Sequence, residues 1–574
     1  MDYKSEFRKW MESDAVDQAT KDELKAAEKD DELLKEMFAG MLEFGTAGLR
    51  GKMRPGTNGM NVYTVRYATQ GMADLILSCG EEIGGGVTIA YDSRNNSRLY
   101  AEEAASVLAA NGIHSFIFDD LRPTPELSFA LRETGSIAGI NITASHNPKE
   151  YNGYKAYWSD GAQLPPQHAA QVSASMQKID IFRDVKTCDF DEAVKRGDVT
   201  VIGREMDEKY MERVLEQSVG GKYVKQAADD FEVVYTPFHG AGYKLVPEVL
   251  TRLGIKHIIP VEEQMIPDGN FPTVKSPNPE NSEGFAMAIA LAKEKNVDLV
   301  IGTDPDSDRC GCAVRAGDDY VTFTGNQIGV LLLDYLITMR REQGTLPDNA
   351  AAVKSIVSTR MFDRVCEMNG VTCVETLTGF KFIGEKIKEF LETGEYTFLF
   401  GFEESLGFLA GTYARDKDAV IAAMLISEAA CYYRTKGMTL YDALMSLYEK
   451  YGYYKEVTES FVFEGLDGKQ EMKDLMAGLR ASHPAEIGLP VTRVRDYLKG
   501  TITDVSDGTE VPTGLDESDV LFYELEDGCA AVIRPSGTEP KIKLYVMACG
   551  PDSGTSEERF SAILDAGTKL LQKA

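Results

Sequence analysis

The sequence predicts an α/β protein built from three similar modules, followed by a smaller α+β domain. Short apolar strands alternate with amphipathic helices over most of the chain, which is typical of parallel sheets covered by helices. This alternation recurs in modules of roughly 100 residues or somewhat more. The C-terminal end departs from the alternation, because strand-like runs dominate there. With 574 residues, the chain is long enough for roughly three to five domains.

Each element follows from the pattern of apolar and charged residues. The first forty residues are charged and helix-periodic as far as Gly40, which predicts an N-terminal helical extension. Its expected packing positions are Trp10, Met11, Leu24, Leu33, Leu34 and Phe38. The first two modules are predicted to contain strands at 86–91, 114–118, 137–142, 231–235, 257–260 and 297–302, with helices at 99–110, up to Leu253, and at 283–295. The remaining predictions are helices at 326–336, 419–433 and 556–571, and strands at 351–357, 519–523, 529–533 and 542–547.

The composition excludes several classes of partner. Lys and Arg total 61 against 91 Asp and Glu, and the net charge of −30 disfavours nucleic acid and anionic membranes. An anionic substrate must therefore be bound by local clusters of Arg and Lys. The first residues show no positively charged stretch followed by an apolar one, and no apolar run reaches the roughly 20 residues that span a bilayer, so we expect a cytoplasmic protein without a secretory leader. The nine cysteines are scattered and are interpreted as reduced structural thiols.

Three carboxylates at alternate positions follow the apolar run 297–302. Side chains two apart project to one side of an extended backbone, so Asp304, Asp306 and Asp308 are expected to converge on one hard cation, most naturally Mg²⁺. Without a cation they would repel one another strongly. A calcium loop of the EF-hand type is excluded, because its sixth and twelfth positions are Arg309 and Arg315 instead of Gly and Glu. The alternative is a solvated acidic loop.

The second candidate loop, Asn141–Pro148, ends another apolar strand. Its small and polar residues are expected to leave the hydroxyl of Ser145 exposed on a tight turn, where it is a candidate nucleophile or phosphate carrier. The loop lacks the Gly-x-Ser-x-Gly pattern of a hydrolase, and plain turn chemistry is the alternative. Downstream, Lys155 would act as a general acid or base if desolvated, and is otherwise a surface charge.

Two further loops carry polar groups suited to a sugar phosphate. Gly401–Gly407 contains adjacent carboxylates and a hydroxyl, which can accept hydrogen bonds from vicinal sugar hydroxyls or cap a helix. The Arg534–Lys541 segment offers a guanidinium, two hydroxyls and an open backbone at Gly537, which favours a phosphate site over a plain hairpin. It is not a Walker loop, and no dinucleotide fingerprint follows a strand.

In this order, the four loops resemble the α-D-phosphohexomutase superfamily. Residues 143–148 are similar to its phosphoserine loop, 304–309 to its magnesium loop, 401–405 to its sugar loop and 534–538 to its phosphate loop. The Phe44–Gly51 segment resembles the branch of bacterial phosphoglucomutases and phosphopentomutases. Thr378–Lys381 resembles a loop that recognises the sugar ring, with Phe380 where relatives often carry Trp.

The resemblance implies a four-domain architecture around a central cleft, with three mixed-sheet α/β domains and a C-terminal α+β domain. The expected domains span 1–207, 208–318, 319–455 and 456–574. It also implies an intramolecular phosphotransferase that interconverts glucose 1-phosphate and glucose 6-phosphate. The reaction would proceed through a phosphoserine enzyme and a bound glucose 1,6-bisphosphate, which also serves as activator, and would need Mg²⁺.

The roles carried over from the superfamily fall into three groups. Ser145, His146, Lys155 and Arg309 are expected to be catalytic, with Lys155 preferred for handling the hydroxyl proton. The expected metal ligands are Asp304, Asp306, Asp308 and a phosphate oxygen on Ser145. The expected substrate-binding residues are Arg50, Gly379, Glu403, Ser405, Arg415, Lys417, Arg534, Ser536, Gly537, Thr538 and Lys543.

Three alternatives stay open. A phosphopentomutase acting on ribose or deoxyribose phosphates would share the Phe44–Gly51 segment. A phosphomannomutase is less favoured, because the sugar loop reads Glu403-Glu404-Ser405. A catalytically silent sugar-phosphate-binding protein on the same fold is the alternative from another class. Either a monomer or a homodimer is compatible with the sequence.

Overall fold

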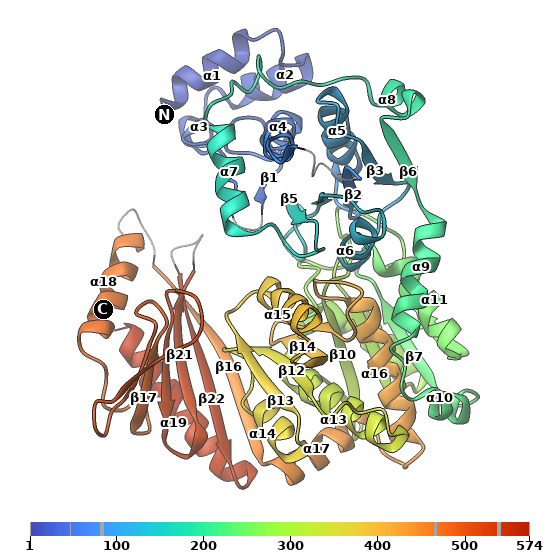
Figure 1. Ribbon diagram of the computed structural model, residues 1–574, viewed down its shortest axis with the longest axis vertical. Helices are drawn as coiled ribbons and strands as arrows, with labels where there is room; N and C mark the ends of the chain where they lie inside the picture. Colours follow the sequence, from blue (N-terminus) through green and yellow to red (C-terminus); the bar gives the residue numbers. More distant parts are fainter. Residues whose placement is uncertain (1, 46–47, 81–84, 464–467, 537–540, 573–574) are drawn as a thin grey trace. The chain divides into compact units, whose positions relative to one another are not determined.

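The computed structural model describes residues 2–45, 48–80, 85–463, 468–536 and 541–572 (Figure 1). Contacts divide the chain into two compact units, each of which is described by itself. The first comprises Met1–Thr324, Gly384–Gly394 and Ser405–Thr439, and the second comprises Gly325–Ile383, Glu395–Glu404 and Leu440–Ala574.

The first unit begins with three short helices on one aromatic cluster. Asp2, Asp17 and Asp30 each accept a backbone N–H at a helix N-terminus, which explains where the helices start. Trp10 is fully buried and meets the ring edges of Phe38, Tyr63 and Phe182. In Figure 1 these helices lie beside α4 and α7. The helices are α1 (Tyr3–Glu12), α2 (Gln18–Ala27), α3 (Asp31–Phe38), α4 (Val62–Ser78) and α7 (Pro166–Met176).

Two sheets form the body of the first unit, and their central strands have the same topology. The six-stranded sheet has the order β1-β5-β4-β2-β3-β6, and the five-stranded sheet has the order β11-β10-β9-β7-β8. In each, three parallel strands (β3-β2-β4 or β8-β7-β9) are followed by an antiparallel one (β5 or β10). This shared order confirms the expected repetition of modules. The loop after β4 and the loop after β9 therefore occupy equivalent positions.

The strands of these sheets are β1 (Leu49–Lys52), β2 (Val87–Tyr91), β3 (Ser115–Phe118), β4 (Ala138–Ile142), β5 (Tyr151–Trp158), β6 (Val199–Ile202), β7 (Glu232–Thr236), β8 (His257–Pro260), β9 (Leu299–Thr303), β10 (Cys310–Ala316) and β11 (Asp319–Thr322). Every residue of β2, β4 and β9 is buried, as expected of strands covered on both faces. The covering helices are α5 (Ser97–Ala110), α6 (Thr124–Glu133), α8 (Phe190–Arg196), α9 (Arg204–Leu215), α10 (Gly221–Ala227), α11 (Gly242–Leu253) and α12 (Ala286–Lys295), with a 3₁₀ turn η2 (Ser282–Phe285) before α12.

Helix α16 (Ala419–Arg434) lies in the first unit, although the sequence placed it in the third module. Fifteen of its residues are buried, and it packs against α10 and α11. A helix that is apolar all round needs cover on every side, and the second module supplies part of that cover. The short strand β15 (Gly407–Leu409) precedes it, and α15 (Phe380–Thr393) crosses the boundary between the units.

The second unit contains parallel strands of the third module and an antiparallel sheet from the end of the chain. Strand β12 (Ala350–Ser355) pairs in parallel with β13 (Thr372–Thr376) and β14 (Thr397–Glu403). The seven-stranded sheet has the order β16-β22-β21-β20-β17-β18-β19. Its strands are β16 (Tyr453–Val462), β17 (Val491–Asp496), β18 (Thr501–Asp504), β19 (Glu510–Pro512), β20 (Leu521–Leu525), β21 (Ala530–Pro535) and β22 (Lys541–Gly550). The helices are α13 (Gly325–Gln343), α14 (Met361–Asn369), α17 (Leu440–Tyr451), α18 (Gly468–Ala481) and α19 (Ser553–Gln572), with the 3₁₀ turn η3 (Glu526–Gly528).

One apolar cluster joins the third module to the antiparallel sheet within the second unit. Ile356, Val357 and Leu377 come from loops after β12 and β13, whereas Val532 and Tyr545 belong to β21 and β22. These side chains are nearly inaccessible to water, so burying them stabilises the two parts together.

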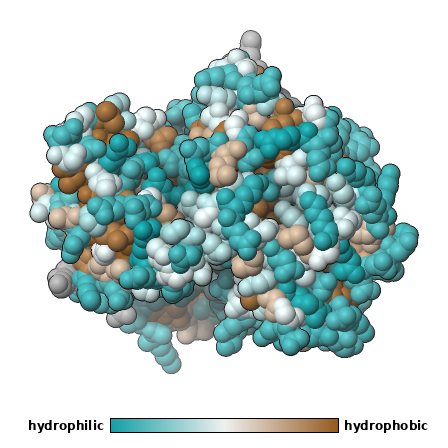
Figure 2. All heavy atoms as spheres, turned by 90° about the horizontal axis from the view of Figure 1, so that it is seen from below, coloured by the Kyte–Doolittle hydropathy of each residue, from teal (hydrophilic) through white to brown (hydrophobic). Residues whose placement is uncertain are grey.

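The surface agrees with the acidic, charged composition. The face in Figure 2 is mainly hydrophilic, with hydrophobic residues in separate patches. Among the described residues, none of the helices is both long enough and apolar enough to cross a membrane.

Candidate active site

The Asp304–Arg309 loop joins β9 to β10 and brings three buried carboxylates together. One oxygen from each of Asp304, Asp306 and Asp308 lies within 4.8 Å of the others. The expected convergence is confirmed, but the expected extended backbone is wrong. The chain turns at Ser307, whose φ is 52°, and the N–H groups of Asp308 and Arg309 donate to Asp304 Oδ1 at 3.1 and 3.0 Å.

Two carboxylate oxygens in this cluster have the character of metal ligands. Asp306 Oδ1 and Asp308 Oδ1 are buried, and neither accepts a hydrogen bond from any described residue. Buried anionic oxygens without a partner carry a large desolvation cost. Because hard cations prefer carboxylate oxygen, the donor set fits Mg²⁺.

Charge in the cluster is unevenly distributed. Burial, reinforced by Asp306 and Asp308, raises the pKa of Asp304 well above its ordinary value. Burial also works to raise the pKa of Asp306 and of Asp308, but neighbouring lysines outweigh it, and both pKa values lie below the ordinary range. Lys155 Nζ lies 2.6 Å from Asp306 and 3.2 Å from Asp308, and Lys417 Nζ lies 3.3 Å from Asp308.

The loop rests on backbone that only glycine can provide. A Cβ on Gly240 would lie 2.4 Å from Pro305 Cα, and one on Gly242 would lie 2.9 Å from Ser307 Oγ. The close approach also allows the N–H of Ala241 to donate to the carbonyl oxygen of Pro305 at 2.8 Å. The two glycines, one just before α11 and one at its first residue, therefore allow the carboxylate loop to approach closely.

Ser145 lies in the equivalent loop after β4 and reaches the carboxylates. Its Oγ donates to Asp304 Oδ2 at 2.9 Å and lies 3.3 Å from His146 Nδ1. The expectation of an exposed hydroxyl is wrong: Ser145 is 3% exposed, because the Asp loop covers it. The backbone here is left-handed (φ 52°), which is uncommon for a residue with a Cβ.

Two candidate proton carriers, one beside this hydroxyl and one beside the carboxylates, differ in protonation state. Burial lowers the pKa of His146 well below its ordinary value, with Arg309 and Arg50 adding to the effect, so the imidazole is neutral near pH 7. Burial acts to lower the pKa of Lys155, but Asp306 and Asp308 outweigh it and keep the ammonium form. Lys155 lies in β5, a strand that the sequence pattern did not predict.

The other expected site residues of the first unit are distributed around these loops. Arg309 pairs with Glu280 at 2.9 Å, and Arg50 donates to Asn147 Oδ1 at 3.1 Å. The guanidinium of Arg415 donates to carbonyl oxygens of its own segment, and burial lowers its pKa to about 10. Ser405 is half-buried.

Two residues missed by the sequence interpretation hold these loops. Thr124, the first residue of α6, donates its hydroxyl to Asp306 Oδ2 at 2.7 Å and its N–H to the Asp306 carbonyl at 2.8 Å. Arg94, just after β2, is buried beneath the Ser145 loop. Two sequence patterns could have drawn attention to these residues. Thr124 begins a Thr-Pro pair that opens a helix, and Arg94 ends an Asp-Ser-Arg tripeptide that follows an apolar strand.

In the second unit, the expected sugar loop is held by hydroxyls and a backbone amide. Glu403 Oε1 accepts the N–H of Gly379 at 2.7 Å. Glu404 Oε2 accepts from Ser355 Oγ at 3.1 Å and from Ser358 Oγ at 3.4 Å. Gly379 has φ 128°, a conformation suited to glycine, which explains the residue type at the start of this turn.

The expected phosphate site has two cations opposite one another on paired strands. Arg534 in β21 is directly across from Lys543 in β22, and Arg534 also donates to the hydroxyl of Tyr545 at 3.3 Å. Like charges across a strand pair repel, so this arrangement favours a bound anion. Ser536 donates its N–H to the Lys541 carbonyl. Gly537 and Thr538 lie outside the described residues.

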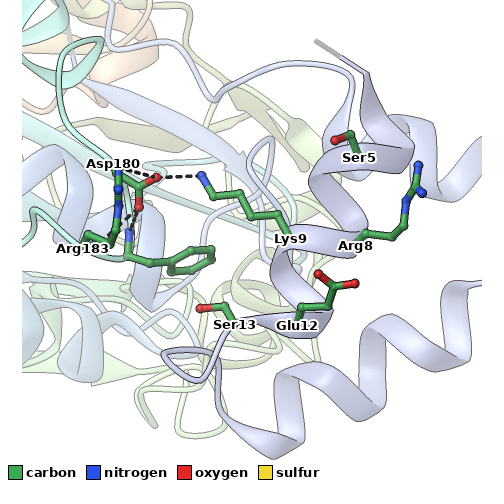
Figure 3. Close-up of a pocket in the computed structure, with 8 residues that line it drawn as sticks. Ser5, Arg8, Lys9, Glu12, Ser13, Asp180 and Arg183 are labelled. Atoms are coloured by element: carbon green, nitrogen blue, oxygen red, sulfur yellow. Dashed lines mark hydrogen bonds and ion pairs between the residues drawn. The ribbon is translucent and has the colours of Figure 1, made fainter.

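A surface hollow of about 810 Å³ beside α1 is separate from these loops. Figure 3 shows Lys9 extending from α1 toward Asp180, with which it pairs at 2.9 Å. Its other lining residues include Arg8, Arg183 and Glu12, so charges of both signs mix there.

Comparison with known proteins gives concordant matches. Three models of "Phosphoglucomutase/phosphomannomutase, alpha/beta/alpha domain" I, II and III match residues 41–182, 208–317 and 324–451. A phosphoglucomutase of Staphylococcus aureus (strain MRSA252) is 37% identical over 535 residues, covering 92% of this chain and 94% of that protein. One of Staphylococcus saprophyticus is 37% identical over 510 residues, covering 88% and 90%.

Solved structures share the fold at lower identity. A putative phosphomannomutase from Thermus thermophilus has a TM-score of 0.67 and 22% identity, covering 93% of this chain and 99% of that chain. The open form of pp63/parafusin, a phosphoglucomutase from Paramecium, has a TM-score of 0.67 and 18% identity, with 94% and 96% covered.

Proposed function

The chain belongs to the phosphoglucomutase/phosphomannomutase family, and on that premise we propose that it is a phosphoglucomutase interconverting glucose 1-phosphate and glucose 6-phosphate. The observation that carries the proposal is the contact between the Ser145 hydroxyl and Asp304, inside a cluster that also contains Lys155. It joins a phosphoryl acceptor, a metal-type carboxylate set and a proton carrier, which phosphoryl transfer requires.

In the proposed cycle, Ser145 carries the phosphoryl group. The free hydroxyl of the sugar monophosphate attacks phosphorus, the bond to Ser145 Oγ breaks, and the hydroxyl proton passes to a base. The product is glucose 1,6-bisphosphate, which turns over and returns its other phosphoryl group to Ser145 Oγ. The isomeric monophosphate then leaves, and no phosphate is lost to water.

Lys155 and His146 are the proposed proton carriers. Lys155 is held as a cation by two carboxylates, and is suited to donate a proton to an oxygen that leaves phosphorus. His146, neutral and 3.3 Å from Ser145 Oγ, is suited to accept one. The superfamily resemblance assigns Lys155 to the sugar oxygen, to which the ammonium form would return a proton when that oxygen leaves phosphorus.

Mg²⁺ would be held by Asp304, Asp306, Asp308 and a phosphate oxygen on Ser145. When bound, it supplies charge neutralisation for the transferring phosphoryl group. Arg309 and Lys417 add positive charge from the protein beside Asp308.

Recognition of the sugar phosphate is assigned to the remaining expected residues. Glu403 and Ser405 would bind ring hydroxyls, with Gly379 shaping the turn beside Glu403. Arg534, Ser536 and Lys543, together with Gly537 and Thr538, would bind the phosphate that does not react. Arg50 and Arg415 complete the set as further phosphate contacts.

The test compares Ser145→Ala with Ser106→Ala, which removes a hydroxyl from α5 that donates to the Glu102 carbonyl. We expect Ser145→Ala to lower conversion of glucose 1-phosphate by about 10⁴-fold or more while the thermal unfolding midpoint changes little. Substantial residual turnover would contradict the phosphoserine assignment. Wild-type enzyme treated with glucose 1,6-bisphosphate should gain one phosphoryl group by mass, and faster turnover of ribose 1-phosphate than of glucose 1-phosphate would favour a phosphopentomutase.

A further inference from the structure

A single buried guanidinium binds the backbone of the Ser145 loop at four points. Arg94 Nη2 donates to the carbonyl oxygens of Ser145 and Asn147 at 2.5 Å each. Its Nη1 donates to the carbonyl oxygens of Pro148 and Tyr151 at 2.9 and 3.0 Å. Three of the acceptors lie in the turn between β4 and β5, and the fourth, Tyr151, is the first residue of β5, so one side chain holds the turn along its length.

Arg94 is itself fixed by its surroundings. Its side chain is inaccessible to solvent, its Nε lies 3.3 Å from Asp92 Oδ2, and the ring of Phe271 lies 5.1 Å from its Cζ. Asp92 in turn accepts from the hydroxyl of Ser97 at 2.8 Å. The guanidinium therefore has little freedom to move, and the turn above it inherits that rigidity.

The clamp has two consequences for the turn. Ser145 is held in a left-handed conformation that costs free energy and persists only where its surroundings enforce it. In addition, the N–H of a trans peptide points opposite to its carbonyl. With the Ser145 carbonyl bound to Arg94, the N–H of His146 points away from the guanidinium, and no described residue accepts it.

We propose that Arg94 is a positioning residue for phosphoryl transfer. It binds the carbonyl oxygens on one side of the turn, and this holds the Ser145 hydroxyl and the His146 N–H in place for the phosphate. Arg94 does not touch the reacting atoms. The proposal rests on the proposed role of Ser145 and goes beyond it. Lys cannot replace Arg here. The planar guanidinium carries several N–H donors at fixed positions, whereas the single ammonium group of Lys cannot reach four separated carbonyl oxygens.

The experiment compares Arg94→Lys and Arg94→Met with the same changes at Arg98, an exposed residue of α5 that pairs with Glu102. Three quantities are measured on the full chain: kcat and KM for glucose 1-phosphate, the rate of Ser145 phosphorylation by glucose 1,6-bisphosphate, and backbone amide exchange of peptides spanning 143–153. Arg94→Lys keeps the positive charge, so it remains informative if Arg94→Met fails to fold.

For Arg94→Lys we expect kcat and the phosphorylation rate to fall together by about 100-fold, the loss typical of an ångström-scale misplacement, with KM nearly unchanged. Amide exchange should rise in 143–153 and stay the same in β2 and α5. The final extent of phosphorylation should reach that of wild type, and the Arg98 variants should behave like wild type.

Two outcomes would overturn the proposal: wild-type kcat with unchanged exchange in 143–153, or a loss of kcat accompanied by faster exchange throughout the first unit. The second would show that Arg94 acts only on overall stability. Neither outcome bears on Ser145 itself, because failure of the proposed function would appear as activity in Ser145→Ala, and the exchange measurement does not depend on that activity.

Discussion

The Ser145 loop and the Asp304–Arg309 loop follow equivalent strands, β4 and β9, and both turn through a serine with φ 52°. They differ in what anchors them. In the first, backbone carbonyl oxygens gather on the cation of Arg94. In the second, backbone N–H groups gather on the carboxylate of Asp304. One backbone geometry is thus held by anchors of opposite charge.

The anchor determines which ligand each loop suits. If the carbonyl oxygens of a turn are bound by the protein, its N–H groups stay available to bind an anion such as phosphate. If the N–H groups of a turn are bound by the protein, its side-chain oxygens stay available to bind a cation. On the proposed function, the repeated module therefore yields a phosphate-facing loop at Ser145 and a metal-facing loop at Asp304–Arg309 from the same strand order.

The largest expected effect breaks the metal-facing loop. Asp308→Asn removes one carboxylate oxygen that lacks a protein partner. Losing several kcal/mol of charge stabilisation corresponds to a fall in turnover of about 10³-fold. Stabilisation against heat by Mg²⁺, which for wild type should reach about 2.7 kcal/mol at 100 times Kd, should largely disappear. Asp318→Asn, in an exposed turn of the same sheet, is the control. A variant that retains the wild-type Mg²⁺ titration would contradict the assignment.

A second change moves the metal-facing loop without touching a ligand. Gly240→Ala places a methyl group 2.4 Å from Pro305 Cα, a backbone atom that cannot give way cheaply. Overpacking of this kind should lower the free energy of unfolding by about 1–3 kcal/mol and weaken Mg²⁺ binding. The same substitution at Gly478 in α18, where no atom lies within 4 Å, should raise the free energy of unfolding by about 0.5–1 kcal/mol. Denaturant unfolding measures both, and equal effects would refute the close contact.

The third module extends the comparison, because its loop turns through Leu406 at φ 63° and its anchors, two serine hydroxyls and one backbone N–H, are neutral. Ser355→Ala removes the closer of the two donors to Glu404. We expect KM for glucose 1-phosphate to rise about 10-fold, the equivalent of one hydrogen bond to a charged group. Ser506→Ala, which removes an exposed hydroxyl bonded to Asp504, should leave KM unchanged. Unchanged KM in both would mean that Glu404 does not shape the sugar loop.

The smallest effect tests the shared left-handed serine. Ser307→Gly relieves strain but adds freedom to the unfolded chain, so the free energy of unfolding should change by less than about 1 kcal/mol. Ser307→Val should cost about 1–3 kcal/mol, since a β-branched residue fits this conformation poorly. Thermal unfolding with both variants decides the point. If valine were tolerated as well as glycine, strain at this position would be negligible.

Much of the fold was predictable because burial leaves a clear trace in the sequence. Strands such as β2, β4 and β9 are continuous apolar runs, and the charged helices α1 and α3 keep a 3.6-residue period. Among the several elements that the sequence interpretation did not predict, β5 and β16 show why. Strand β5 is buried yet contains Asn152 and Lys155, and β16 has no fully buried residue, so neither shows alternating burial.

The convergence of the three carboxylates was predictable from the sequence, and the arrangement around them was less so. The three carboxylates come together as expected, and Lys155 reaches them from strand β5 of the other sheet of the first unit. The turn at Ser307, the burial of Ser145 and the clamp by Arg94 depend on contacts between loops distant in sequence. No local pattern encodes such contacts.

The apolar cluster that joins the third module to the antiparallel sheet bears on the spacing between two groups of proposed substrate-binding residues. Leu377 lies two residues before Gly379 and shares this cluster with Tyr545, which accepts a hydrogen bond from Arg534. The spacing between the proposed ring-binding and phosphate-binding groups is thus fixed by packed side chains. A fragment ending before β16 would expose the apolar face and tend to aggregate. On the proposed function, this spacing would have to match the distance between a sugar ring and its phosphate in both orientations of the bisphosphate.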